Sequence, residues 1–327
     1  MFVSGRSKTI ALLSLFPVLS LPCASQSTST KPEVTQSATA VKPVALTTIV
    51  YNGKGNLVTG LQRENFKAFI DNKPAEIVDF REEDGPLSVG IVFDASASVG
   101  YPQLMRPLIK SSQQALSTFL QTSNPANEYF LMAFNLKPQL MLDWSSDSRA
   151  IINTLSMVQP KGNTAFYDAC YLALNKAQHG RYSRQVLILI TDGEDNVSTY
   201  SLNQVRDELK ASGVVVYSLN FAGTGEAGSA LGMEGQHILE DLSSVSGGRF
   251  FYQRFGRAMS TSDASDAFEV ISQELRHQYT ITVMSNISSD NNKWHKIRIK
   301  LQAATSAPGE MKHLSARTRE GFYLNHR

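Results

Sequence analysis

Three oxygen-bearing side chains stand at alternate positions just after a short apolar run. The run, Val89 to Phe93, is rich in β-branched residues and too short for a helix, so it predicts a buried strand. Asp94, Ser96 and Ser98 follow it. Because alternate residues of an extended chain face the same way, all three oxygens can point at one position. Hard oxygen donors of this kind suit a divalent cation such as Mg²⁺.

Two further oxygen-bearing loops follow predicted elements later in the chain. Thr164 directly precedes the helical pattern Ala165 to Gln178, and Asp192 follows the apolar run Val186 to Thr191. In an open α/β sheet, ligands bind at the carboxyl ends of the strands. We therefore expect the loops of Asp94, Thr164 and Asp192 to open on one rim, which would hold two carboxylates and three hydroxyls.

Three more acidic residues lie close to this set in the sequence. Asp168 stands one helical turn after Thr164, where it can neutralise a helix N-terminus or support the site indirectly. Glu194 and Asp195 follow Asp192 and are expected to be solvated charges at the rim.

Each predicted ligand also has a purely structural interpretation. Ser96 and Ser98 could cap the following helix, and Asp192 could serve only the turn that contains it. Taken together, five oxygens at strand ends favour a metal site. The six histidines are scattered without zinc-ligand spacing, which disfavours catalytic zinc.

The middle of the chain, about Pro86 to His277, alternates apolar strands with helical patterns. This alternation predicts a mainly parallel sheet with helices on both faces. The predicted strands are Val89 to Phe93, Tyr129 to Phe134, Gln139 to Trp144, Val186 to Thr191, Val214 to Phe221 and Arg249 to Tyr252. The predicted helices are Tyr101 to Leu120, Asp147 to Met157, Ala165 to Gln178, Ser201 to Ser212, His237 to Ser246 and Asp263 to His277.

In this middle part, the connection Asn135 to Pro138 is short enough to require a hairpin. The strand after it, Gln139 to Trp144, should therefore be an antiparallel edge of the central sheet.

Both ends of the chain instead show short alternating runs typical of strands. The terminal strands are predicted at Ala45 to Tyr51, Asn56 to Val58, Phe66 to Ile70, Glu76 to Phe80, Tyr279 to Met284, His295 to Leu301 and Gly321 to Leu324. The turn-forming run Asp71 to Pro74 predicts a hairpin between Phe66 to Ile70 and Glu76 to Phe80. Neither terminal group is large enough to be stable alone.

We therefore expect a doubly wound, mainly parallel α/β domain inserted between strands of a smaller β-sandwich. The expected boundaries are a signal peptide at 1–25, a disordered linker at 26–42, sandwich strands at 43–83, the α/β domain at 84–278 and further sandwich strands at 279–327. Separate terminal domains are the competing arrangement.

The first 25 residues have the plan of a secretory signal: a basic start, an apolar run and small residues. Cleavage is expected after Ser25, and lipidation of Cys23 is less favoured because Ser20 and Pro22 fit a lipobox poorly. No later run is long enough for a membrane span. The mature chain should thus be secreted or periplasmic.

Charge and cysteine content narrow the function classes further. All 29 acidic residues lie beyond residue 25, whereas 2 of the 31 basic residues, Arg6 and Lys8, lie before it. A balanced mature chain gives no reason to invoke nucleic acid or an anionic membrane. Cys170 would remain alone, so no intramolecular disulfide is possible, and we expect a buried, inert thiol.

The pattern Asp94-x-Ser96-x-Ser98, with Thr164 and Asp192, resembles the metal-ion-dependent adhesion site of von Willebrand factor type A domains. The resemblance implies that the three hydroxyls coordinate Mg²⁺ or Mn²⁺ directly and that the two carboxylates act directly or through water. The family often has Gly at the position of Ala97 and Met at that of Val99. Neither departure removes a ligand.

A resemblance over most of the mature chain is to a secreted "VWFA-related" family common in acidobacteria. The similar segments are Val58 to Leu61 with Phe66, Asp71-x-Lys73-Pro74, Pro86 to Ser88, Trp294 to Ile297 and Arg319-x-Gly321-x-Tyr323. This resemblance implies a bacterial setting and no known activity.

The function we expect is that of a binding module. It would capture an Asp or Glu carboxylate of a protein partner on the metal. A phosphatase of the haloacid dehalogenase type would need a second Asp where Ser96 stands, and a serine hydrolase would need a Gly-x-Ser-x-Gly elbow. Neither is present, so we expect no enzyme. An alternative function is that of a structural envelope protein with a non-functional metal site. A separate question is whether a shift of the last helix, Asp263 to His277, tilts one domain against the other.

Overall fold

The computed structural model describes residues 42–96, 113–220, 230–252, 261–285, 287, 293–302 and 313–324. The described residues all belong to one compact unit, Thr39–Arg327. The signal peptide, the lipidation of Cys23 and nearly all of the linker therefore lie outside the described residues. So does Ser98.

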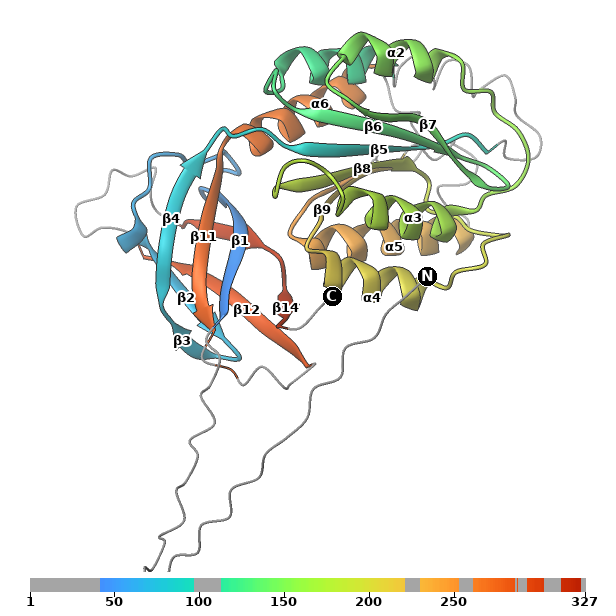
Figure 1. The fold of residues 1–327 in the computed structure, drawn as a ribbon. Coiled ribbons are helices and arrows are strands. Elements are labelled where there is room, and N and C mark those ends of the chain that lie inside the picture. The colour runs from blue at the N-terminus through green and yellow to red at the C-terminus, as the bar shows by residue number, and fades with distance from the viewer. Residues whose placement is uncertain are drawn as a thin grey trace, which may run out of the picture. The chain divides into compact units, whose positions relative to one another are not determined.

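A six-stranded sheet forms the centre of the α/β domain (Figure 1). In spatial order its strands are β10 (Phe250–Phe251), β9 (Val215–Asn220), β8 (Gln185–Thr191), β5 (Ser88–Asp94), β6 (Glu128–Phe134) and β7 (Pro138–Ser145). Neighbouring strands are parallel throughout, except that β7 pairs antiparallel with β6 at one edge. The predicted antiparallel edge strand is thus confirmed.

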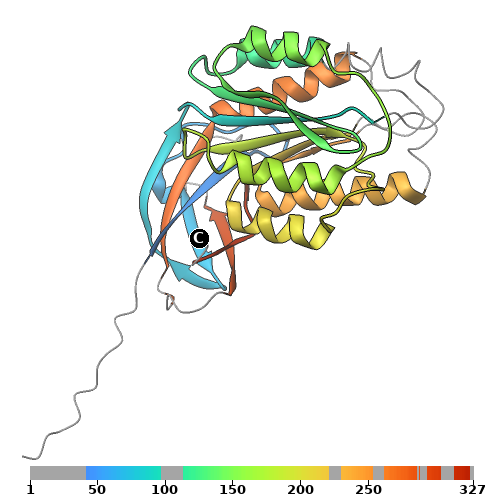
Figure 2. The ribbon, with the colours of Figure 1, turned by 45° about the vertical axis from the view of Figure 1, so that its right-hand side comes forward.

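Helices cover both faces of this sheet (Figures 1 and 2). One face carries a helix over residues 113–122, α2 (Ser148–Ser156) and α6 (Thr261–Arg276), and the other carries α3 (Phe166–Ala177), α4 (Leu202–Ser212) and α5 (Ala230–Ser246). Strand side chains alternate between two hydrophobic cores: Ile91 and Phe93 belong to one, and Val92 to the other. Because both faces are buried, β5 reads as an unbroken apolar run.

Strands from both ends of the chain form two four-stranded antiparallel sheets. The first, in spatial order, contains β13 (Ser315–Thr318), β1 (Lys42–Tyr51), β11 (Gln278–Ser285) and β4 (Ile77–Glu83). The second contains β14 (Gly321–Tyr323), β12 (Trp294–Leu301), β2 (Phe66–Ile70) and β3 (Lys73–Ala75), and a short 3₁₀ helix, η1 (Arg63–Asn65), precedes β2. Side chains of both sheets, such as Leu46, Ile281 and Ile299, share one core. The expected fold class, an α/β domain inserted into a smaller β-sandwich, is confirmed.

The predicted hairpin between Phe66 to Ile70 and Glu76 to Phe80 is wrong. β2 turns instead into the three-residue strand β3, with Ile70 opposite Lys73. Asp71 and Asn72 both have positive φ, 48° and 66°, which makes a two-residue turn and starts the pairing at once. β4 then crosses to the other sheet and pairs with β11.

One other strand prediction needs correction, and one strand was missed. The run Asn56 to Val58 forms only an isolated bridge, between Leu57 and Tyr51. β13 was not predicted, because its sequence, Ser-Ala-Arg-Thr, is largely polar, and only pairing with β1 makes it a strand.

Two smaller observations concern the thiol of Cys170 and the apolar character of the helices. Cys170 lies buried in α3 as predicted, and burial raises the pKa of its thiol. Among the described residues, no helix combines the length and the apolar character that crossing a membrane requires.

Candidate functional site

The two predicted site carboxylates follow neighbouring parallel strands. Phe93 of β5 lies opposite Ile190 of β8, so Asp94 ends β5 and Asp192 follows β8 at the same edge of the sheet. The Asp94 residue is 9% exposed. Register alone therefore brings these two side chains to one rim, as the sequence predicts.

Asp94 is held by hydrogen bonds at both of its carboxylate oxygens. Its Oδ1 accepts from the backbone N–H of Ser96 at 2.8 Å, and its Oδ2 accepts from the hydroxyl of Thr191 at 2.7 Å. The Ser96 side chain also hydrogen-bonds this carboxylate. Thr191 Oγ1 in turn accepts from Gly193 N at 3.1 Å. One hydroxyl thus fixes the ends of both strands to each other.

The loop that carries Thr164 is joined to both neighbours. Lys161 N donates to Ala95 O at 2.9 Å, which connects this loop to the end of β5. Thr164 N donates to Asn196 Oδ1 at 2.9 Å, and Asn196 N donates to Thr164 O at 3.0 Å. The loops of Asp94, Thr164 and Asp192 are therefore linked pairwise, and the Thr164 residue is 7% exposed.

Electrostatic repulsion is built into this rim. Burial, and next the charge of Asp192, raise the pKa of Asp94 to about 7. Burial also raises the pKa of Asp192, whose Oδ1 accepts a hydrogen bond from Glu194 N at 3.0 Å. Two carboxylates held together in a low-dielectric setting favour either a proton or a bound cation.

The neighbouring acidic residues organise the start of α3. Its N-cap residue, Ala165, makes no side-chain cap. Asp195 supplies one instead, since its Oδ1 accepts from Tyr167 N at 3.2 Å, and Ser198 Oγ accepts from Asp168 N at 3.1 Å. The sequence predicts a solvated charge at Asp195, whereas the structure shows a half-buried residue that caps α3.

Asp168 supports the site loops from α3. Its Oδ1 accepts from the backbone N–H groups of Thr199 and Tyr200, both at 2.8 Å. Asp168 thus holds the backbone of this segment, and its support of the proposed metal site stays a prediction. The side chain of Glu194 is partly buried in the same loop.

Two residues of the site were missed in the sequence. Thr191 reads as the last residue of an apolar strand, and the Thr-Asp dipeptide was the only available signal for it. Asn196 gives no signal, because its partner Thr164 lies 32 residues away.

The donor chemistry of the rim fits a hard divalent cation. Within the described part of the chain, no three His, Cys, Asp or Glu side chains lie together so that they could hold a metal. A cation here would therefore need hydroxyl oxygens besides the two carboxylates. Ser96, Thr164, Asp94 and Asp192 offer that mixed oxygen set, which Mg²⁺ or Mn²⁺ prefers.

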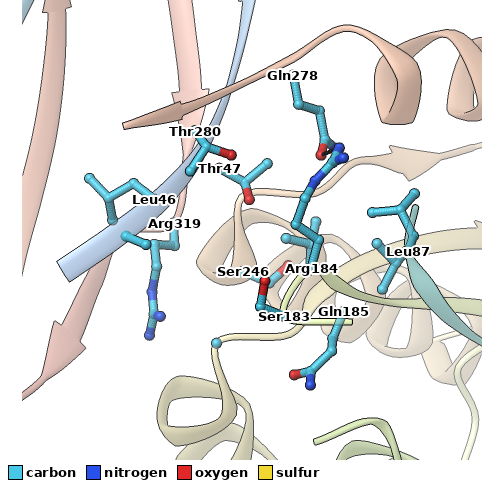
Figure 3. A pocket seen from close by; sticks show the side chains of 14 residues that line it. Leu46, Thr47, Leu87, Ser183, Arg184, Gln185, Ser246, Gln278, Thr280 and Arg319 are labelled. Atoms are coloured by element: carbon cyan, nitrogen blue, oxygen red, sulfur yellow. Dashed lines mark hydrogen bonds between the residues drawn. The ribbon is translucent and has the colours of Figure 1, made fainter. Parts of the chain in front are cut away.

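A cavity of about 130 Å³ lies at the opposite end of β8 (Figure 3). At this cavity the Arg184 guanidinium donates a hydrogen bond to Gln278, whereas the Arg319 side chain points away from Gln278. Arg184 also donates to Gly85 O at 2.8 Å and to Leu275 O at 2.9 Å. This arginine therefore serves the packing of α6 and β11 against the sheet.

Comparison with known proteins identifies the central part of the chain. Residues 89–194 match the family profile described as the von Willebrand factor type A domain. No curated protein matches the sequence.

Several solved structures are similar. A mutant of the PilB minor pilin from Streptococcus sanguinis has 16% identity and a TM-score of 0.46, over 58% of this chain and 61% of that chain. This chain thus spans less than two thirds of that pilin. An aerotolerance-related membrane protein from Bacteroides fragilis has 18% identity and a TM-score of 0.44, over 58% and 98%. The vWF domain of the type V pili tip protein Mfa5 from Porphyromonas gingivalis has 14% identity and a TM-score of 0.46, over 57% and 94%.

Proposed function

Because this chain contains a von Willebrand factor type A domain, we propose that it is a metal-dependent protein-binding module. Mg²⁺ or Mn²⁺ would be held by Asp94, Ser96, Ser98, Thr164 and Asp192. The domain family itself favours protein interaction over catalysis. The metal would supply an electrophilic centre for a carboxylate oxygen of the partner.

One observation supports this proposal most strongly: the buried carboxylate of Asp94 and the half-buried carboxylate of Asp192 repel each other on a rim whose loops are tied by hydrogen bonds. The charge of Asp192 contributes to the raised pKa of Asp94. The bond from Thr191 holds one carboxylate oxygen of Asp94, and the bonds to Asn196 hold the backbone of Thr164. A preorganised oxygen set reduces the ordering cost of binding a cation.

The chain's own residues would select the partner's chemistry. The two carboxylates balance the formal charge of the cation, but neutral hydroxyls are weak donors. The metal would therefore stay an electrophile, and a partner carboxylate would coordinate it more strongly than a neutral group would. Burial of Asp94 and Thr164 limits access of water and strengthens this attraction. We propose no catalytic role, because the described residues of the rim include no positioned base or nucleophile beyond the proposed ligands.

The proposal includes an extracytoplasmic location, after cleavage near Ser25, with lipidation at Cys23 as the weaker alternative. Mass spectrometry of the purified mature chain distinguishes the two, because cleavage after Ser25 removes Cys23.

Calorimetric titration of Mg²⁺ and Mn²⁺ into the metal-stripped chain tests the site. One binding site is expected, and Ser98→Ala and Asp192→Ala should each abolish it. Ser117→Ala is a control, since Ser117 lies in the helix 113–122 away from the rim. Saturable binding that survives both ligand substitutions would overturn the proposed ligand set, and no binding at millimolar metal would overturn the proposal.

A further inference from the structure

Exposed apolar side chains gather on the short connections around Thr164. The described part of the chain has eight large apolar residues classed as exposed, and three lie on these connections: Leu136 (50% exposed), Met157 (70%) and Val197 (38%). We call these three the apolar rim. The other five are spread over separate elements, namely Val78, Leu140, Leu172, Met233 and Tyr252.

Leu136 lies in the turn between β6 and β7, against the Thr164 loop. A Cβ atom on Gly162 would be 3.1 Å from Leu136 Cγ, so the side chain covers this glycine. The preceding residue, Asn135, accepts a hydrogen bond at its carbonyl from Ala165 N at 2.7 Å. Leu136 therefore contacts the loop two residues before Thr164.

Val197 and Met157 are connected to the same loop, Val197 through its neighbour Asn196 and Met157 along the chain. Val197 directly follows Asn196, which is bonded to Thr164 through both its backbone and its side chain. Met157 caps the end of α2 and opens the connection that leads to Thr164. Single exposed apolar residues are ordinary on a protein surface, but a group beside a polar binding centre marks an interaction surface.

We propose that the partner's carboxylate lies within an apolar segment and that the apolar rim contacts the residues that flank it. This inference rests on the proposed metal-dependent function. An ionic contact to a metal is strong only where water is excluded, and apolar contacts around a polar anchor exclude it. A partner with apolar residues beside its Asp or Glu would bury Leu136, Met157 and Val197. A partner with a uniformly polar segment would leave them in water.

Two short peptides test this specificity. Both are acetylated, amidated and fluorescently labelled: Gly-Leu-Asp-Leu-Gly and Gly-Ser-Asp-Ser-Gly. In Mn²⁺, fluorescence anisotropy with the full chain should show roughly tenfold tighter binding of the leucine peptide, since burying side chains of this size contributes on this order. Replacing Asp by Asn in the peptide should abolish binding.

Matched variants locate the contact. Leu136→Ser and Val197→Ser should each reduce the preference for the leucine peptide about threefold and leave the Mn²⁺ affinity unchanged. Leu172→Ser and Val78→Ser, at residues that are 42% and 45% exposed and lie elsewhere, should leave the preference intact.

Metal binding without a peptide preference, or without any peptide binding, overturns the apolar rim but not the metal site. An equal effect of all four substitutions also overturns it. Failure to bind Mn²⁺ at all would instead overturn the proposed function on which it rests.

Discussion

Asp94 lies in an unfavourable electrostatic environment at the rim. It ends a fully buried strand, and its carboxylate accepts from Ser96 N and Thr191 Oγ1. These hydrogen bonds stabilise the ionised form, whereas burial and the charge of Asp192 oppose it more strongly. The net effect is a pKa of about 7 in the folded state.

This raised pKa predicts a pH dependence of stability for the metal-free chain. Between the ordinary pKa of aspartate, about 4, and about 7, the folded state holds a proton that the unfolded state has released. The free energy of unfolding should therefore fall as the pH rises through this window. Urea unfolding at about pH 5 and about pH 8 measures the change.

Asp94→Asn is the control, because the amide cannot titrate. Its free energy of unfolding should depend less on pH over this window, and saturating Mg²⁺ should reduce the loss in the parent chain. An identical pH dependence in the parent and in Asp94→Asn would contradict this prediction.

Among the elements, the loop after β8 depends on a close backbone contact with α5. Gly193 has φ of +83°, and a Cβ atom there would lie 2.5 Å from Gly235 O and 2.9 Å from Leu239 Cγ. A Cβ atom on Gly235 would in turn lie 2.5 Å from Asp192 O. Two glycines thus allow α5 to support the segment that carries Asp192.

Gly193→Ala should therefore destabilise the chain by more than its positive φ alone explains. Gly55 has nearly the same φ, +81°, but nothing lies within 4 Å of its Cβ position. We expect Gly55→Ala to cost about 1 kcal/mol and Gly193→Ala roughly 3 kcal/mol or more, because the second must also move backbone. Urea unfolding of both variants measures this, and equal losses would show that the backbone contact is unimportant.

At the scale of the whole described unit, a buried carboxylate connects α6 with the sandwich strands. Glu274 is fully buried and forms an ion pair with Arg317 of β13, and Arg249 lies 3.0 Å from its Oε1. The Tyr51 hydroxyl of β1 donates to the same oxygen at 2.5 Å. Strands from both ends of the chain thus contact one carboxylate of the inserted domain: Arg317 pairs with its charge, and Tyr51 donates a hydrogen bond to it.

Arg317→Met should leave Glu274 buried with less compensation and cost about 3–5 kcal/mol. The exposed pair of Arg81 and Asp79 provides a control, and Arg81→Met should cost less than about 1 kcal/mol. Thermal unfolding followed by circular dichroism compares the two. The prediction fails if both substitutions cost the same, and replacing Glu274 by Leu as well should restore part of the stability.

Local pattern in the sequence was sufficient for the order of the elements of the inserted domain and for the shared rim of Asp94, Thr164 and Asp192. One boundary was wrong, because α5 begins at Ala230 and the predicted helix began at His237. Short apolar runs and helical periodicity fix the order of strands and helices, and parallel strands must present their carboxyl ends at one edge. The proposed ligands can be predicted in the same way, because oxygen donors stand at the ends of these runs.

Tertiary structure alone decided how these parts are held. The bonds from Thr191 to Asp94 and from Asn196 to Thr164 join residues that are 97 and 32 positions apart. The partner of β4 depended on the tight turn at Asp71, and β13 became a strand only beside β1. Such contacts are absent from local sequence because their free energy arises only when distant segments meet.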